Sequence, residues 1–284
     1  MVREAWQERY PPGREENTVI DGIVDAPKSL EVSQADTGRF GILVARVPDL
    51  KAEQVAASVD WCEERAVALL ISRCSAAEPR AAHAMQRHGF LLMDCLATYE
   101  HPLTELPSSP PDAGFAIRSA VAADADAVEN LARRSFGTHR GHYHADPRLD
   151  RSACDEVYAS WARDAVIDDT PSTLTVVAAV HDEVIGFATL TGAGNEVAVG
   201  GVAAVTPSHR GKGVYRSMMV ERLRLARRSG SKRTVVSAHV ANIAPQRCWT
   251  DLGYRIVGST YTFHRWADAL SPSIGETGSS VDEL

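Results

Sequence analysis

The most constraining feature of the sequence is a glycine-rich turn between an apolar stretch and an amphipathic one. Residues 196–205, EVAVGGVAAV, have the composition of a buried strand. The turn TPSHRGKG follows, and the next segment places Tyr215, Met219 and Leu223 on one helical stripe. A turn through glycines into a helix leaves backbone amides at the positive end of the helix dipole, where phosphate binds. The pattern predicts an α/β fold with a phosphate-binding turn at residues 210–216.

The turn differs from the common phosphate loops. RGKGVY lacks the GxxxxGK[ST] of a Walker loop and the GxGxxG of dinucleotide folds. Taken alone, it is also compatible with an ordinary strand-to-helix connection. The arginines of the following helix, Arg222 among them, are expected mostly outside the apolar stripe.

The order of elements around the turn predicts a mixed α/β sheet. Asp124 is placed to cap a helix that ends at Phe136. The expected order is β-α-β-β-β-α-β-α-β. Its strands are FAIRSA, LTVVAAV, VIGFATL, EVAVGGVAAV, RTVVSAHV and RIVGSTYTFHRW.

With these motifs, the region from Phe115 to Trp266 resembles the GNAT acyl-CoA N-acyltransferases. Arg210, Gly213 and Tyr215 occupy the marked positions of the family's [R/Q]-x-x-G-x-[G/A] loop. The resemblance implies a GNAT fold with a mixed, mostly antiparallel sheet and flanking helices. It also implies acetyl-CoA or another acyl-CoA as cosubstrate, without a metal. The implied cofactor-binding residues are Val202, Ala203, Val205, Arg210, Gly211, Lys212, Gly213, Val214, Tyr215, Arg216, Asn242 and Trp249.

Two residues depart from the family pattern. Tyr215 stands where the family usually has glycine or alanine, either as a core aromatic or as a ring bordering the acyl or acceptor site. Trp249 stands where many members carry a tyrosine that protonates the departing thiolate, and indole cannot do this. Either the thiolate takes its proton from water or another group, or the protein binds coenzyme A without catalysis.

The segment from Ser135 to Val166 is the candidate acceptor-binding region. It combines histidine, arginine and aromatic residues in a long connection, although a solvated surface loop is the alternative. The predicted substrate-binding residues are Arg140, His142, Tyr143, His144 and Arg148. The segment resembles sugar-nucleotide 4-amino N-acetyltransferases of the TDP-fucosamine type, which implies a nucleotide-linked amino sugar as acceptor. Arginines suit its diphosphate. A peptide N-terminus, a lysine or another metabolite amine is the alternative acceptor.

The chemistry implied is direct attack of an amine on the thioester in a ternary complex. Glu196, at the start of the fourth strand, and His239, on the fifth, are the predicted catalytic residues, each a candidate general base. His142 and His144 are further candidates. Each could instead be a solvated or hydrogen-bonded structural residue.

Residues 1–101 are predicted to form a smaller, partial GNAT-like domain. Aligning Gly89 with Gly253 places Phe90 under Tyr254 and Tyr99 under Phe263, although the N-terminal copy has no glycine loop. Chance similarity between two helix-glycine-strand units is the alternative. Residues 102–114 are predicted to be a linker, 115–268 the catalytic GNAT domain and 269–284 a disordered tail.

The amino-acid composition excludes some classes of binding partner. A net charge of −7 argues against nucleic-acid binding, and no stretch is apolar and long enough for a membrane span. Five scattered cysteines are typical of reduced thiols in a cytoplasmic protein, and their spacing indicates no metal site. A homodimer is compatible with the sequence, which does not decide the acyl chain length or the acceptor.

Overall fold

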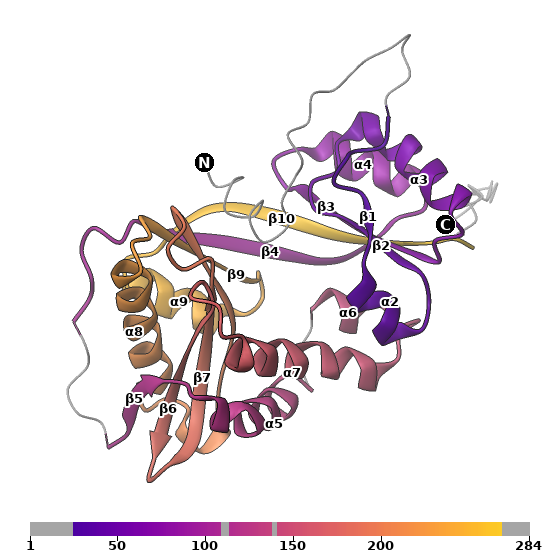
Figure 1. Ribbon diagram of the computed structural model, residues 1–284. Helices are drawn as coiled ribbons and strands as arrows, with labels where there is room; N and C mark the ends of the chain where they lie inside the picture. The colour runs from indigo at the N-terminus through magenta and orange to yellow at the C-terminus, as the bar shows by residue number, and fades with distance from the viewer. Residues whose placement is uncertain (1–24, 109–113, 138–140, 269–284) are drawn as a thin grey trace, which may run out of the picture.

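Two long strands, β4 (Leu91–His101) and β10 (Arg255–Trp266), lie side by side across the middle of the molecule (Figure 1). The structure is a computed structural model that describes residues 25–108, 114–137 and 141–268. All its strands belong to one sheet of ten, in the order β1-β2-β3-β10-β4-β9-β8-β7-β6-β5. Within this sheet only the β2–β3 and β8–β9 pairs are parallel. The predicted mixed, mostly antiparallel α/β sheet is therefore confirmed.

The predicted order of the C-terminal strands is also confirmed, but helices at 142–145 and 151–167, which that order lacks, lie between its first helix and its second strand. We call residues 114–268 the C-terminal half. Its elements are β5 (Ala116–Ser119), α5 (Ala125–Phe136), α6 (His142–Ala145), α7 (Arg151–Ile167), β6 (Leu174–Val180), β7 (Glu183–Thr191), β8 (Val197–Val205), α8 (Val214–Arg228), β9 (Arg233–His239), α9 (Ile243–Asp251) and β10. Short 3-10 turns precede α5 and α8 at Ala122–Asp124 and Pro207–His209.

The N-terminal half, residues 25–108, has a shorter version of this order. Its elements are β1 (Glu31–Val32), α2 (Gln34–Phe40), β2 (Val44–Val47), the 3-10 turn Ala52–Gln54, α3 (Val55–Glu64), β3 (Leu69–Ser75), α4 (Pro79–Arg87) and β4. The internal alignment of Gly89 with Gly253 is an offset of 253 − 89 = 164 residues. Adding 164 to the bounds of β3 and α4 gives 233–239 and 243–251, which are the bounds of β9 and α9.

The same offset appears in the pairing of β4 with β10. Leu96 pairs with Thr260, and 96 + 164 = 260, so an approximate two-fold axis passes between these residues. On either side, Tyr99 pairs with Ile256 and Leu92 with Phe263, and the offset exchanges one pair for the other. This register supports an internal repeat over β3, α4 and β4. The division into domains at residues 101 and 115 stays a prediction.

The repeat is closed by an exchange of strands. Strand β10 lies between β3 and β4, and β4 lies between β10 and β9. Each half therefore places its last strand among the strands of the other half. Because hydrogen-bonded pairing is continuous across this junction, the two halves share one sheet.

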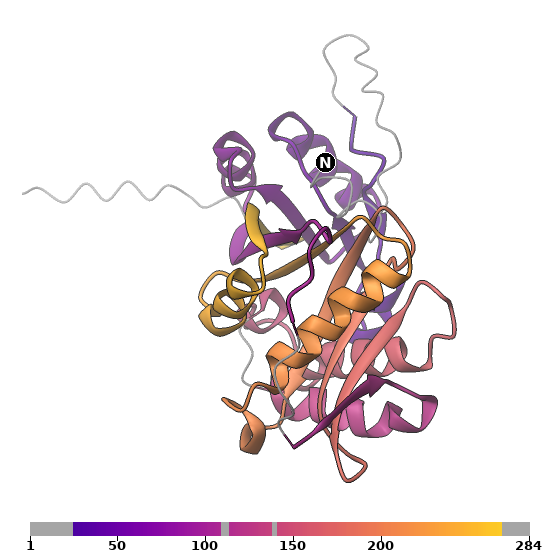
Figure 2. The same ribbon diagram turned by 90° about the vertical axis from the view of Figure 1, so that its left-hand side faces the viewer.

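The helices cover both faces of the sheet. Helices α8 and α9 pack with β6, β7 and β9 in one apolar cluster, and α3 and α4 pack with β3 in a second. Helices α2, α5, α6 and α7 lie on the opposite face, in two further clusters (Figure 1). Figure 2 shows α8, in orange, lying along the strands that it covers.

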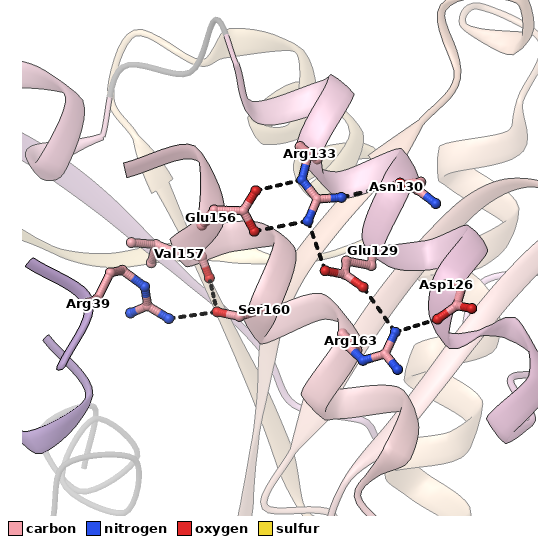
Figure 3. A network of polar contacts seen from close by, with 9 residues as sticks. All are labelled: Arg39, Asp126, Glu129, Asn130, Arg133, Glu156, Val157, Ser160 and Arg163. Atoms are coloured by element: carbon pink, nitrogen blue, oxygen red, sulfur yellow. Dashed lines mark hydrogen bonds and ion pairs between the residues drawn. The ribbon is translucent and has the colours of Figure 1, made fainter. Parts of the chain in front are cut away.

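An ionic network fastens the helices of that opposite face (Figure 3). Arg133 of α5 donates to both carboxylate oxygens of Glu156 on α7, at 2.6 and 2.9 Å. Arg163 of α7 donates back to Glu129 of α5 at 2.9 Å. Arg39 of α2 donates to Ser160 of α7 at 2.7 Å, so the network reaches the N-terminal half.

Candidate functional site

The parallel strands β8 and β9 separate partway along their length. They pair from Val197 with Arg233 to Val199 with Val235, and this is the extent of their pairing among the described residues. Strand β8 then continues to Val205 alongside β7 alone. From Gly200 onward its backbone has no strand partner on the β9 side among the described residues, which is what an extended ligand would require to pair with it.

A β-bulge lies at the point of separation. Ala188 of β7 pairs with Ala203, and Leu190 pairs with Gly200, so residues 201 and 202 oppose the single residue Thr189. Thr189 Oγ1 donates to the carbonyl of Val202 at 3.3 Å. A bulge bends its strand and changes which side chains face each side of the sheet. Ala198 and Val205 accordingly pack under α8, whereas Ala204 packs against α5 and Val202 against α5 and α7.

The glycine turn lies at the open end of this separation. Gly211 and Gly213 have φ of 75° and 82°, in the left-handed region that favours glycine. Arg210 Nε donates to the carbonyl of Val205 at 3.2 Å, which folds the turn onto the strand end. The amide of Ser217 donates to the carbonyl of Gly213 at 3.0 Å and begins the helical ladder. The amides of residues 214–216 precede that bond, so the helix offers them no acceptor.

Tyr215 and Trp249, the two residues that depart from the family pattern, contact each other. Trp249 Nε1 donates to the hydroxyl of Tyr215 at 3.0 Å, and Trp249 is only 4% exposed. Burial raises the pKa of the Tyr215 phenol above its ordinary value, so it stays neutral. Tyr215 packs on the apolar cluster under α8 and α9, as the core alternative expected. The sequence did not predict this hydrogen bond, because each residue was considered alone.

The other implied cofactor-binding residues surround the separation. Val202 and Ala203 are half-buried on β8, while Lys212 is exposed in the turn and Arg216 is half-buried in the first turn of α8. Asn242 is the exposed N-cap residue of α9, and its amide donates to the carbonyl of His239 at 2.8 Å. The structure thus brings the implied cofactor set to one end of β8 and β9.

The two predicted catalytic residues lie at opposite ends of the strand pair. Glu196 precedes β8 at the closed end, where its side chain is 71% exposed and accepts from Arg233 at 3.3 Å. His239 ends β9 at the open end and is half-buried. Its Nδ1 accepts from the amide of Ala241 at 3.1 Å, which places the proton of the neutral ring on Nε2. The structure does not bring these two side chains together.

Two of the predicted substrate residues are buried between the halves. His142 is 4% exposed and Tyr143 is fully buried. The His142 amide donates to Asp94 of β4 at 3.0 Å, and its Nδ1 lies 3.0 Å from Nε2 of His264 on β10. The hydroxyl of Tyr143 donates to Asp36 at 2.8 Å. In these positions both residues join α6 to the N-terminal half, and their contact with a substrate stays a prediction.

The remaining substrate candidates lie around the same segment. His144 Nε2 lies 2.9 Å from Asp155 Oδ1. Arg148 makes two bonds to Asp268, at 2.6 and 2.9 Å, and stacks 4.0 Å from the centre of the Trp266 ring. Arg140 lies outside the described residues.

Sequence reasoning missed polar groups contributed by the N-terminal half. Arg46 and Arg73 line a small pocket of about 20 Å³, together with Glu31 and Ser29. Arg46 also donates to Tyr143, so the pocket lies beside α6. The sequence did contain an indication of this site. Arg46 and Arg73 each interrupt an otherwise apolar strand at a position where a buried residue is expected.

The expectation for Arg222 was wrong. Arg222 is 2% exposed and lies on the side of α8 that faces the sheet. A Cβ built on Gly200 would lie 2.6 Å from Arg222 Nη1, so the guanidinium packs directly against a bare strand backbone. The expectation failed because the buried side of the helix was assigned from its apolar residues alone, and this method leaves out a buried charged residue such as Arg222.

Fold and site together define a GNAT-type α/β protein, with a splayed parallel strand pair beside a glycine turn. Residues 126–254 match the acetyltransferase (GNAT) family. These residues therefore form a GNAT acetyltransferase domain, and acyl-CoA is the cosubstrate of that family.

Solved structures share this fold over nearly the whole chain. A GCN5-related N-acetyltransferase from Sphaerobacter thermophilus covers 93% of this chain and 90% of its own, with a TM-score of 0.60 and 16% identity. A tandem GNAT protein from the clavulanic acid biosynthesis pathway covers 94% and 87%, with a TM-score of 0.56 and 17% identity. At these identities the likeness shows the fold.

A curated relative is the spore coat polysaccharide biosynthesis protein SpsD of Bacillus subtilis (strain 168). It is 24% identical over 195 residues, which are 68% of this chain and 65% of that relative. The match thus spans less than two thirds of the relative's length.

Two searches of the described residues were negative. None of their helices is both long and apolar enough to cross a membrane. No three histidine, cysteine, aspartate or glutamate side chains among them are grouped to hold a metal ion.

Proposed function

We propose that the protein transfers an acetyl group from acetyl-CoA to the amine of a nucleotide-linked amino sugar. The observation that carries the acyl-transfer part is the separation of β8 from β9 with the glycine turn at its open end. The unpaired edge of β8 leads directly to the free backbone amides at the start of α8. A coenzyme A molecule needs both, one for its pantetheine arm and one for its pyrophosphate.

The cofactor would be held mainly by backbone. Amides of residues 211–216 would bind the pyrophosphate, and Lys212 and Arg216 would add charge. The strand from Val202 to Val205 would pair with the amides of the pantetheine arm. The Trp249–Tyr215 pair packs in the core beneath α8 and α9, close to the turn.

The acceptor would lie beside α6, on the face of the sheet that α5 and α7 cover. Arg46 and Arg73 line a pocket beside α6, and guanidinium groups bind diphosphates well. The polysaccharide biosynthesis relative supports a sugar acceptor. Of the predicted substrate residues that the structure describes, Arg148 is the one with an exposed side chain, at 46%.

Among the predicted catalytic residues, we assign a role at the acceptor to His239 rather than Glu196. Glu196 lies four residues before Gly200, about 13 Å along the strand on the closed side. His239 lies at the open end, and its Nε2–H is a donor. His239 would therefore hydrogen bond the acceptor and orient its amine, while the proton of that amine passes to water.

The test is thiol release from acetyl-CoA with a panel of amines. The panel holds TDP- and UDP-linked amino sugars, free amino sugars, peptide N-termini and lysine. We expect turnover with a nucleotide-linked amino sugar, and at least a tenfold lower kcat/KM for the same sugar without its nucleotide. Turnover only with peptides or lysine would remove the acceptor assignment and leave acyl transfer standing. Binding of acetyl-CoA without turnover on any amine would contradict both.

A further inference from the structure

The guanidinium of Arg222 is buried beneath α8, and two of its three nitrogens have no partner within the described part of the chain. Arg222 is 2% exposed, and its Nε and Nη2 have no hydrogen-bond partner among the described residues. An arginine side chain keeps its charge throughout the pH range in which proteins fold. Burying such a charge unpaired is strongly unfavourable. An anion that reached this point would therefore be stabilised.

Arg222 lies where β8 and β9 begin to separate. Gly200 is the residue of β8 directly after Val199, where pairing with β9 ends. A Cβ on Gly200 would meet Arg222 Nη1 at 2.6 Å and Val236 Cγ1 of β9 at 2.7 Å. The guanidinium and both strands thus meet at one place, and the missing side chain of Gly200 makes the approach possible.

The sulfur of a bound coenzyme A would lie near Arg222 and Gly200. Arg222 follows Val214 by eight residues, about 12 Å along α8. Gly200 precedes Val205 by five residues, about 17 Å along β8. The pantetheine arm has about twelve bonds from phosphate oxygen to sulfur, roughly 14 Å when extended. A cofactor with its phosphates at residues 214–216 and its arm along β8 therefore brings its sulfur level with Arg222.

The titratable groups around Arg222 do not neutralise it. The phenols of Tyr215 and Tyr254 and the thiol of Cys248 lie in the same cluster under α8 and α9. Burial raises the pKa of Tyr215 and of Cys248, so both stay uncharged. The hydroxyl of Tyr254 is buried and has no partner among the described residues.

More distant charged and titratable groups face this cluster. Arg216 and Asp251 act on Cys248 with opposite signs, and the ring of His101 on β4 lies 5.1 Å from that of Tyr254. None of these distant groups supplies a contact to Arg222 among the described residues.

We propose that Arg222 stabilises the thiolate of coenzyme A when the acyl group leaves it, in place of an acid at position 249. The inference rests on the proposed function. The amine nitrogen bonds to the thioester carbonyl carbon, the carbon–sulfur bond breaks, and its electron pair stays on sulfur. The amine proton goes to water. The thiolate pairs with Arg222 until water protonates it. Arg222 is then a catalytic residue that contacts the leaving sulfur.

The test measures binding of coenzyme A without any acceptor. Calorimetric titrations with coenzyme A and with desulfo-coenzyme A, which has the same phosphates, are made from pH 6.5 to pH 9. In the natural protein we expect coenzyme A to bind at least tenfold more tightly at the higher pH, relative to the desulfo compound. Arg222→Met should abolish that difference and Arg222→Lys should keep part of it. Arg224→Met, on the outer side of the same helix, should behave as the natural protein does.

Each outcome decides the matter. Equal pH profiles in the natural protein and in Arg222→Met would overturn the inference and leave the proposed function intact. No binding of either compound would overturn both. Tighter binding of succinyl-CoA than acetyl-CoA that depends on Arg222, without the pH difference, would instead assign Arg222 to an acyl carboxylate. Arg222→Met should fold with a midpoint temperature no lower than that of the natural protein, because an unpaired buried charge is removed. Failure to fold would contradict that premise.

Discussion

Tyr215 and Trp249 show why substitutions at a site are best considered in pairs. A buried indole N–H needs an acceptor, and the phenol that replaces a small residue of the loop supplies one at 3.0 Å. Seen singly, each residue is a departure from the family pattern. Together they form one packed unit between α8 and α9, which keeps the turn in place without an ionisable group at position 249.

The glycines of the turn are expected to control cofactor affinity through backbone conformation. Gly213→Ala puts a Cβ into open space but at a φ of 82°, which an L-residue adopts at a cost of about 1 to 2 kcal/mol. We expect the turn to relax and acetyl-CoA affinity to fall about tenfold in calorimetry. Gly230→Ala, at a φ of 95° and equally open, is the matched control far from the turn. Its acetyl-CoA affinity should be unchanged, and an equal loss in both variants would point to global instability.

His239 can be tested by separating its two ring nitrogens. In His239→Gln the side-chain NH2 group can still donate from about the position of Nε2, whereas His239→Ala removes both this donor and the acceptor for Ala241. We expect kcat to fall about tenfold more in the alanine variant, with an unchanged pH dependence of kcat in both. If both variants lost activity equally, together with the acidic limb of the profile, a general base would be the better assignment.

At the scale of the element, helix α8 depends on two bare strand positions. It packs on β7 at Gly186, where a Cβ would meet Met218 Cε at 3.0 Å, and on β8 at Gly200. Glycine in a strand is unfavourable in itself, so its presence at both contacts indicates close approach of the helix.

Gly200→Ala should therefore destabilise the fold. The new methyl would overlap Arg222 Nη1 and Val236 Cγ1, and overpacking of this kind costs about 1 to 3 kcal/mol. Urea unfolding measures the loss. Gly258→Ala, a strand glycine with nothing within 4 Å, should change the free energy of unfolding by less than about 0.5 kcal/mol. Introducing Arg222→Ala as well should recover part of the loss, and no recovery would mean that Val236 alone causes it.

The short helix α6 gives the junction of the halves a pH dependence. His142 Nδ1–H donates to His264 Nε2, and His264 Nδ1–H donates to Asp146 at 2.7 Å. Burial holds the pKa of His142 well below its usual value and also lowers that of His264. Both rings are neutral when folded, whereas the unfolded chain protonates them below about pH 6.5. Unfolding then takes up protons, so stability is full above that pH and is lost as the pH falls.

Denaturant unfolding from pH 7 to pH 5 should show this slope. Each histidine that stays neutral contributes about 1.4 kcal/mol per pH unit below about pH 6.5. His142→Asn keeps a donor near His264 but cannot titrate, so it should reduce the slope by about that amount. His83→Asn, at an exposed position, should leave the slope unchanged. A slope that His142→Asn does not alter would place the titration elsewhere.

For the whole molecule, the exchange of β4 and β10 makes folding a joint property of the halves. We expect one cooperative transition in calorimetry, because neither half has a complete sheet of its own. A protein cut within residues 109–113 should yield two pieces that copurify as a one-to-one complex. Each piece expressed alone should lack a cooperative transition, since its strand edges are uncovered. A stable, cooperative C-terminal piece would contradict this expectation.

The sequence predicted the helices and strands better than it predicted which strands pair and which side chains are buried together. The order of strands and helices, the glycine turn and the alignment of Gly89 with Gly253 were readable, because each rests on local periodicity or on backbone freedom. The exchange of strands was not readable, because pairing between distant strands leaves no local pattern. Arg222, Arg46 and the burial of His142 were missed for a related reason: a charge or an imidazole in the interior follows from its neighbours, which a linear pattern does not contain.

The strand exchange also couples the evolution of the two halves. An N-terminal half that lacks the glycine turn would ordinarily be free to accumulate changes. Here that half supplies the strand that borders β9, so its loss would leave the C-terminal half with an open edge. Natural selection on the C-terminal half is therefore expected to act on β4 as well. Substitutions should accordingly be fewer in β4 than in the exposed surface of α3.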